Sequence, residues 1–382
     1  MDPEKSIILT ELRDRYNKII IEHGEAEIPD VVEIENDIVE DERIIPQSVI
    51  EEIKKRAPRM LGARTRALRD VSLSIADAWG PSLSELDKCL ALADVVFARL
   101  SRAIFTSGDV LRRKDPRPAP DRVTGAFVKC LLMLSLYGKS CGIATEIASL
   151  IKTGLPNAAL SRLRTLHEHL VIITVLHNDQ SYEISEQYED CSVFENLKQL
   201  KADQSALADP VWQVPEGYEE RLQLEITEVE DLAREIVARR GPTIRKSYEW
   251  ARQALPQLKR ENPRYNIKFV DLEEAVGMNF FRGNYLAGNE RVHAGSYSAV
   301  NHINFDKPLV PQSRPRRDDW AIRLAGWRTA FLIANVAHGV GKSIAWETEE
   351  YDEFLYVCEL CRTAYNALDA FVATAGSASP SA

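Results

Sequence analysis

The spacing of apolar residues most constrains what this chain of 382 residues can fold into. Apolar side chains recur every three or four positions along most of the sequence, whereas the strict alternation typical of strands is scarce. Because that spacing places apolar side chains on one face of a helix, we predict an all-α fold, a multi-helix bundle. The expected helices cover residues 4–23, 50–78, 83–111, 124–153, 157–178, 181–206, 218–240, 246–258, 272–292, 318–344 and 348–374.

Two adjoining segments predict the centre of this bundle. Residues 124–153 are apolar around most of a helix circumference, which is typical of a buried helix. The turn Gly154-Leu-Pro156 ends that helix and starts the next, residues 157–178, so the two form an antiparallel αα-hairpin. Gly138 and Gly142 lie one turn apart, and we expect a neighbouring helix to approach closely there.

Proline and glycine mark the expected boundaries. Three prolines fall within five residues in a basic stretch after residue 115, and proline cannot continue a helix. We therefore expect an N-terminal helical region at residues 1–115, a helical bundle at 116–375 and a disordered tail at 376–382. Within the N-terminal region, Gly80-Pro81 is expected to separate two helices.

The net charge of −10 is unevenly distributed. Residues 22–43 hold ten carboxylates and one arginine, whereas residues 54–69 hold seven basic side chains and no acidic one. One interpretation is an acidic arm that covers a basic surface and mimics a nucleic acid there. The other, which we prefer, is two solvated stretches that add solubility and a few weak ion pairs.

Composition indicates a cytoplasmic protein without a membrane partner. The N-terminus lacks the basic flank and apolar run of a signal peptide, and no apolar stretch reaches the roughly 20 residues that span a bilayer. The six cysteines lie in apolar surroundings, as expected for reduced, buried thiols. Cys358 and Cys361 have the spacing of metal ligands but no second pair nearby, so we expect two buried small side chains and no metal or cofactor.

The familiar enzyme signatures are missing, including a Walker A loop, a dinucleotide glycine fingerprint, a nucleophile elbow and Glu-x-x-His. A first polar cluster interrupts the apolar helix at residues 157–178. It consists of Arg162, Arg164, His167, Glu168 and His169. Arg164 and Glu168 are four apart and share one helix face, so they could form a pocket in which Arg164 holds an anion and Glu168 positions a base. Alternatively, they form a buried pair that fixes the register of the helix.

A second cluster steps by three and four along residues 272–292 and just beyond. Arg282, Tyr285, Asn289 and His293 would form one polar stripe on a helix. His293 could titrate near neutral pH and act as an acid or base. Alternatively, it complements the helix dipole at the C-terminus. Arg282 and His293 lie roughly 16 Å apart along a straight helix.

Together the clusters resemble an uncharacterised bacterial domain-of-unknown-function family. The residues that carry the resemblance are Gly154-Leu-Pro-Asn-Ala-Ala-Leu-Ser-Arg-Leu-Arg-Thr-Leu-His-Glu168, with its Arg-x-x-x-Glu motif, and Asn289-Glu-Arg-Val-His293, an Asn/Ser-x-x-Val-His motif. The match covers residues 120–300 at most. That family in turn resembles the HEPN superfamily of compact helical bundles, many of which are metal-independent endoribonucleases in toxin and phage-defence systems. The resemblance implies a HEPN-like core with an N-terminal helical extension.

The HEPN resemblance also implies residue roles. His293 would be the acid or base, Glu168 the supporting acid, and Arg282 or Arg291 the phosphate clamp, often across a dimer. The spacing departs from the pattern, because no arginine stands five to seven positions before His293. We expect the substrate to be bound by the nearby polar residues, which are Arg162, Arg164, Tyr285 and Asn289.

Two functions follow as expectations. The first is a metal-independent endoribonuclease or RNA-targeting effector of a bacterial phage-defence or toxin system, active as a homodimer and with a protein partner encoded nearby. The second is a non-catalytic helical module that binds a nucleotide, small effector or protein through the same polar pocket. The irregular arginine spacing favours the second, and the stripe that ends in His293 favours the first.

Overall fold

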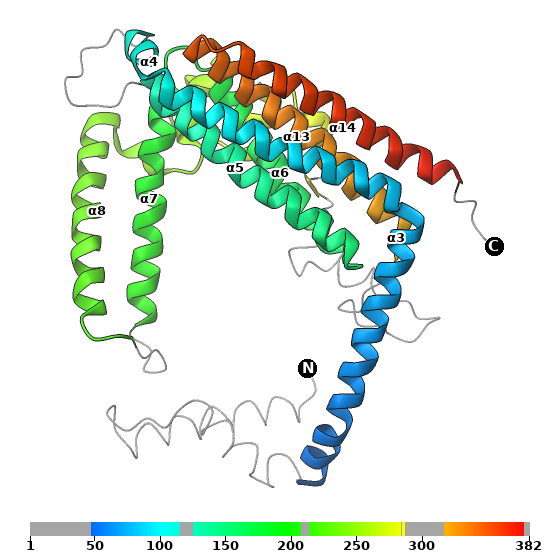
Figure 1. The fold of residues 1–382 in the computed structure, drawn as a ribbon. Helices are drawn as coiled ribbons and strands as arrows, with labels where there is room; N and C mark the ends of the chain where they lie inside the picture. Colours follow the sequence, from blue (N-terminus) through cyan, green and yellow to red (C-terminus); the bar gives the residue numbers. More distant parts are fainter. Residues whose placement is uncertain (1–46, 115–124, 208–213, 284, 287–316, 378–382) are drawn as a thin grey trace. The chain divides into compact units, whose positions relative to one another are not determined.

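The computed structural model describes residues 47–114, 125–207, 214–283, 285–286 and 317–377. All regular elements within these residues are helices, and no strand occurs among them (Figure 1). The α-helices are α3 (Gln47–Thr106), α4 (Gly108–Lys114), α5 (Gly125–Lys152), α6 (Pro156–Asn178), α7 (Glu183–Ala206), α8 (Tyr218–Arg240), α9 (Gln257–Arg260), α10 (Phe269–Ala275), α13 (Asp319–Thr348) and α14 (Asp352–Ser377). The 3-10 helices are η1 (Pro242–Arg245), η2 (Glu249–Ala254) and η3 (Asn279–Phe281). The prediction of an all-α, multi-helix bundle is confirmed.

The chain divides into two compact units, each of which is described separately. Among the described residues, the smaller unit holds residues 47–66, 196–207 and 214–231, and the larger holds 67–114, 125–195, 232–283, 285–286 and 317–377. In the smaller unit the C-terminal part of α7 packs on the N-terminal part of α8 through Leu200, Leu222 and Ile226. The boundary expected between residues 115 and 116 stays a prediction.

In the larger unit, α5, α6 and α13 pack on one another and α14 lies along α13 (Figure 1). The αα-hairpin predicted from Gly154-Leu-Pro156 is present as α5 and α6. Gly154 adopts a left-handed φ of 77°, which glycine tolerates without cost, and Pro156 occupies the first turn of α6. This hairpin holds the first polar cluster on a core helix.

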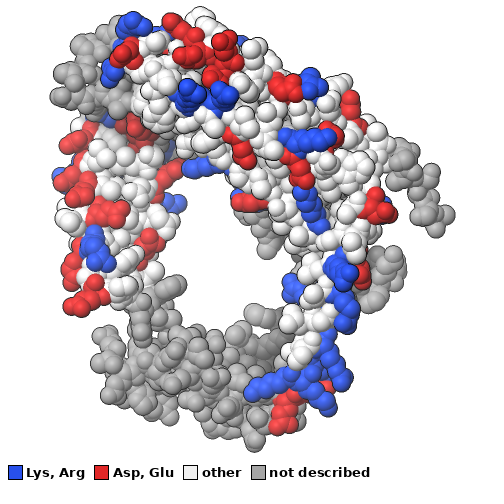
Figure 2. Space-filling view, viewed as in Figure 1, with Lys and Arg blue, Asp and Glu red and all other residues white. Residues whose placement is uncertain are grey.

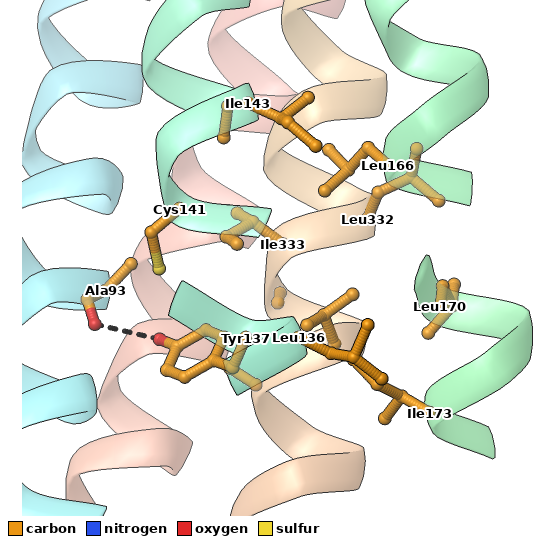
Figure 3. Close-up of a cluster of buried hydrophobic side chains, with 14 of the residues drawn as sticks. Ala93, Leu136, Tyr137, Cys141, Ile143, Leu166, Leu170, Ile173, Leu332 and Ile333 are labelled. Atoms are coloured by element: carbon orange, nitrogen blue, oxygen red, sulfur yellow. Dashed lines mark hydrogen bonds between the residues drawn. The ribbon is translucent and has the colours of Figure 1, made fainter. Parts of the chain in front are cut away.

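Close packing of large apolar side chains joins α5 to its neighbours (Figure 3). Leu136 of α5 lies beside Ile173 of α6 and near Leu332 and Ile333 of α13, and all four side chains are buried. On the other side of α5, the buried Tyr137 hydroxyl donates to the carbonyl oxygen of Ala93 in α3 at 2.9 Å. A buried hydroxyl without such a partner would destabilise the core, so this bond permits tyrosine at a core position.

Helix α5 is also long and apolar enough, by length and composition, to cross a membrane. Most of its residues are instead buried against the other helices of the unit. Its apolar character is therefore explained by its central place in the bundle.

Glycines allow the closest approaches between helices. A Cβ on Gly138 would lie 2.9 Å from the ring of Phe97, as expected, whereas nothing lies within 4 Å of such an atom on Gly142. The tightest contact is on α13, where a Cβ on Gly326 would lie 2.2 Å from the ring of Phe371. Phe371 is fully buried and stacks on Trp79, so it has no free space to move into.

The expected break at Gly80-Pro81 is wrong, because α3 runs through it without interruption. Proline removes one backbone hydrogen bond, but tertiary contacts on both sides hold the helix. Trp79 donates to the carboxylate of Asp319 at 2.7 Å, and the Ser82 hydroxyl lies 2.9 Å from that of Thr374. Burial of this segment therefore outweighs the local cost of the proline.

Two other expected helices are shorter than predicted. Residues 246–258 form the 3-10 helix η2 and the single turn α9 instead of one α-helix. Residues 272–292 do not start as one helix either, because α10 ends at Ala275 and Gly277 adopts a φ of 70°. That left-handed glycine stops the helix and reorients the chain before Arg282.

Several sequence predictions lie outside the described residues, including the helix at 4–23, the acidic segment 22–43 and most of the tail. The basic side chains predicted to be solvated are exposed along α3 (Figure 2). They are Lys54, Lys55, Arg56, Arg59, Arg64, Arg66 and Arg69. Cys89, Cys130 and Cys141 are buried as expected, whereas the expectation that Cys358 is buried is wrong, since it lies on the outer face of α14.

We expect Gly326→Ala to lower the free energy of unfolding by about 1–3 kcal/mol, since the added methyl must displace the buried Phe371 ring. Gly142→Ala is the matched control, because it adds the same methyl group to a helix in open space. It should leave stability unchanged or raise it by about 0.5–1 kcal/mol. Urea unfolding measures both; equal stability of the two variants would contradict the packing.

Candidate functional site

Helix α6 brings part of the first cluster together with part of the second. Arg164 and Glu168 are four residues apart on α6, and Arg164 Nε donates to Glu168 Oε1 at 3.0 Å, as their spacing predicts. Arg164 Nη2 donates to the hydroxyl of Tyr285 at 3.1 Å, from a residue 121 positions away. The two polar clusters therefore meet at one guanidinium group.

This guanidinium lies on an aromatic platform. Its central carbon is 4.7 Å from the ring centroid of Tyr285, within the range of a cation–π interaction. Tyr285 in turn stacks on Phe269 of α10, with centroids 5.0 Å apart. The side chains of Arg164 and Glu168 remain about a quarter exposed (24% and 25%), so solvent or a ligand can reach both groups.

The electrostatics favour a charged Arg164 beside neutral tyrosines. Burial opposes ionisation of Arg164, but the charge of Glu168 and the bond to Tyr285 outweigh it and raise the pKa of the guanidinium. Burial and the negative charge of Glu168 raise the pKa of Tyr285. The same two causes raise the pKa of Tyr248, which is the N-cap residue of η2. At neutral pH Arg164 is thus a cation, and Tyr285 and Tyr248 keep their hydroxyl protons.

A second set of contacts lies beneath this surface. Glu273 of α10 has no exposure to water, and each of its oxygens accepts one hydrogen bond. His167 Nε2 donates to Oε1 at 2.8 Å, and Arg282 Nη1 donates to Oε2 at 3.0 Å. Arg282 is 40% exposed and its charge compensates the buried carboxylate.

His167 is held as a neutral ring. Burial lowers its pKa below the ordinary value of 6.5, although Glu273 acts in the opposite direction. Its ring packs against Phe269, Phe281 and Tyr285 at centroid distances of 5.7–6.3 Å, which separates it from solvent. Because Nε2 donates to Glu273, the ring acts as a structural donor that holds α10 to α6.

The structure separates some of the predicted site residues. Arg162 points to Glu146 of α5, with Nε 2.7 Å from Oε2 in an exposed pair, and does not join Arg164. Residues two apart on a helix face different directions, which explains the separation. Asn289, Arg291 and His293 lie outside the described residues, so the expected meeting of Glu168 with His293 stays a prediction.

Sequence reasoning missed Glu273, Tyr248 and Phe269. Glu273 stands beside Glu274 in a run that looks like an ordinary polar helix face, and nothing local distinguishes the buried carboxylate from the exposed one. Tyr248 adopts a left-handed φ of 61°, which no motif indicates. Among the residues that the structure describes, no three His, Cys, Asp or Glu side chains gather closely enough to hold a metal ion.

The fold and this site define an all-helical bundle that carries an arginine–carboxylate–tyrosine cluster on a core helix. Residues 131–308 match the model of DUF5677, a family of unknown function. The matched region includes α6 and Tyr285. The predicted resemblance to an uncharacterised domain-of-unknown-function family is thereby confirmed over these residues, whereas the HEPN resemblance stays a prediction. No curated protein and no solved structure matches the chain.

We expect Glu273→Gln to lower the free energy of unfolding by about 1–3 kcal/mol, because the amide NH₂ replaces one buried acceptor and faces a donor. Glu274→Gln is the matched control at the next position, where the side chain is half exposed and pairs with Lys259. Its effect should stay within about 0.5 kcal/mol. Chemical unfolding measures the free energy of unfolding of both variants. Equal losses would contradict the prediction that the buried bonds of Glu273 stabilise the fold.

We also expect stability to fall in acid as the half-buried His169 becomes protonated. Burial, with Lys139 and Arg162, lowers the pKa of His169 from 6.5 to about 4. Since the unfolded chain then binds more protons, His169 contributes its full stability above pH 6.5 and loses it as the pH falls toward 4.

A His169→Asn variant tests this contribution. The Ser140 hydroxyl donates to the Leu136 carbonyl, so it accepts from His169 Nδ1, and an asparagine amide can replace that donor. The variant should lose stability less steeply over this range, by up to about 1.4 kcal/mol per pH unit. Urea titrations at half-unit pH intervals measure both slopes; parallel slopes would contradict the prediction.

Proposed function

We propose that the chain is a metal-independent endoribonuclease or RNA-targeting effector whose substrate phosphate binds at Arg164. The observation that carries the proposal is the meeting of Arg164, Glu168 and Tyr285, because it joins the two clusters on which the HEPN resemblance depends. A partly exposed, permanently charged guanidinium on a tyrosine ring suits a phosphate beside a nucleobase.

In this proposal RNA cleavage proceeds by attack of a 2′-hydroxyl oxygen on the adjacent phosphorus. A base takes the hydroxyl proton, an acid protonates the leaving 5′ oxygen, and Arg164 stabilises the charge of the transition state. His293 is the proposed acid or base, and Glu168 holds Arg164 in place through its ion pair. The exposed basic side chains of α3 support a polyanionic partner.

The setting of the proposal also comes from the resemblance. It includes a bacterial phage-defence or toxin system, action as a homodimer and a protein partner encoded nearby, and the proposed cytoplasmic location comes from the composition. Light scattering of the purified protein tests the dimer directly. If the protein is a monomer at every concentration tested, the proposed homodimer is refuted.

The test is RNA cleavage by the purified protein in the presence of EDTA. We expect wild type to cleave, His293→Ala to lose at least about 100-fold in rate, and Arg164→Ala to lose a comparable factor. Arg362→Ala is the matched control, since it removes an arginine from an exposed Arg–Glu pair on α14. Equal cleavage by wild type and His293→Ala would refute the catalytic role.

A second function rests on a different observation. Glu168, the expected supporting acid, is already paired with Arg164, and the neighbouring His167 is buried, neutral and bonded to Glu273. We therefore also propose a non-catalytic module that binds a nucleotide or small effector at Arg164. It predicts ligand-induced thermal stabilisation that Arg164→Ala abolishes, with no cleavage by wild type. If Arg164→Ala unfolds the protein, the pair fixes the helix register instead.

A further inference from the structure

A separate cavity of about 780 Å³ lies at the C-terminal end of α6. It is formed by the end of α6, the segment that leads into α7, the last turns of α13 and the start of α14. His177 at this end is 13 residues from Arg164, which corresponds to about 20 Å along the helix axis. The volume lies within the range of small-molecule sites.

The inner wall of the cavity carries a buried charge. The side chain of Lys129 is 4% exposed, and its Nζ donates to the carbonyl oxygen of Asp179 at 2.7 Å and to Glu347 Oε1 at 3.3 Å. The Tyr182 hydroxyl donates to the other oxygen of Glu347 at 2.9 Å. Lys129 and Glu347 thus compensate each other, and both carboxylate oxygens are engaged.

The segment between α6 and α7 is built to hold this wall. Asp179 is buried, and its two carboxylate oxygens accept four hydrogen bonds from the backbone and hydroxyl groups of Ser181 and Ser185. Tyr182, the residue after Ser181, has a left-handed φ of 62°, which is an unfavourable backbone conformation for a side chain of this size. The contacts around it therefore fix Tyr182 against Glu347 at a backbone cost.

Two buried polar atoms of the lining have no hydrogen-bond partner. They are the hydroxyl oxygen of Ser343 and Nδ1 of His177. Serine and threonine in these helices commonly donate to the carbonyl four residues earlier, as Thr348 does to Ile344. Ser343 is 2% exposed, makes no such bond and lines the cavity. Buried groups of this kind usually pair with a ligand or water.

The outer wall combines aromatic rings with an uncompensated positive charge. Trp346 and Tyr351 are 66% and 57% exposed, although large aromatic side chains are commonly buried. Lys342 lines the opening, and among the described residues no carboxylate forms an ion pair with it. Burial, and to a lesser extent the charges of Lys129 and Lys342, lowers the pKa of His177 to about 4.

We propose that this cavity binds a small aromatic anion, with its ring against Trp346 and Tyr351 and its negative group at Lys342. Ser343 and His177 then hydrogen-bond polar atoms on the ring. A nucleoside monophosphate and an indole carboxylate share this chemistry, so the experiment includes both. The site is independent of the function proposed for Arg164.

The test is calorimetric titration of the full-length protein with adenosine monophosphate, uridine monophosphate, the two nucleosides and indole carboxylate. We expect saturable binding of a monophosphate or of the carboxylate, and at least about tenfold weaker binding of the uncharged nucleosides. Trp346→Ala and Lys342→Gln should each weaken binding about tenfold or more. Ser343→Ala, which removes the unpartnered hydroxyl, should also weaken binding relative to wild type, without loss of thermal stability.

Matched controls come from the same helix. Trp320→Ala removes another exposed tryptophan of α13, and Arg323→Gln removes another exposed cation, and neither residue lines the cavity. Both should bind as wild type does. Absence of saturable binding for every probe overturns the proposal. Loss of binding in Arg164→Ala together with normal binding in Trp346→Ala also overturns it, because the ligand then occupies the other site.

Discussion

A carboxylate that is removed from water determines how the polar surface of α6 is assembled. Glu273 is fully buried, so its charge needs both Arg282 and the ring N–H of His167. The bond from His167 attaches α10 to α6, and the bond from Arg282 attaches α10 to the chain just after η3. Three residues beyond Arg282, Tyr285 then meets Arg164. The accessible cluster is thus a consequence of a buried one.

The sequence predicts well where the local pattern and the burial agree. Residues 124–178 show this, because an apolar circumference, a left-handed glycine and a proline at the first turn all specify the α5–α6 hairpin. Pro81 shows the opposite case. Its local effect favours a break, but Trp79 on one side and Ser82 on the other are fixed by α13 and α14, from more than 200 residues away. Contacts of that range leave no local signal.

The same distinction applies to the site. Arg164 and Glu168 were predictable because a helix brings residues four apart into contact, whatever surrounds it. Their partner Tyr285 was predictable as a candidate but not as a contact, and the expected helix that carried it is interrupted at Gly277. Glu273 was not predictable, since the choice between it and Glu274 depends on which face of a seven-residue helix meets α6.

Unsatisfied polar atoms distinguish the two ends of α6. At its middle, His167 Nδ1 has no partner, but the ring is enclosed by Phe269, Phe281 and Tyr285, so no ligand can reach it and the histidine serves the fold. At its C-terminal end, His177 Nδ1 and the Ser343 hydroxyl oxygen also lack partners, and both residues line a cavity. A protein core tolerates an isolated unpaired atom at some cost, whereas two such atoms on residues that line the same cavity are better explained by an occupant that pairs with both.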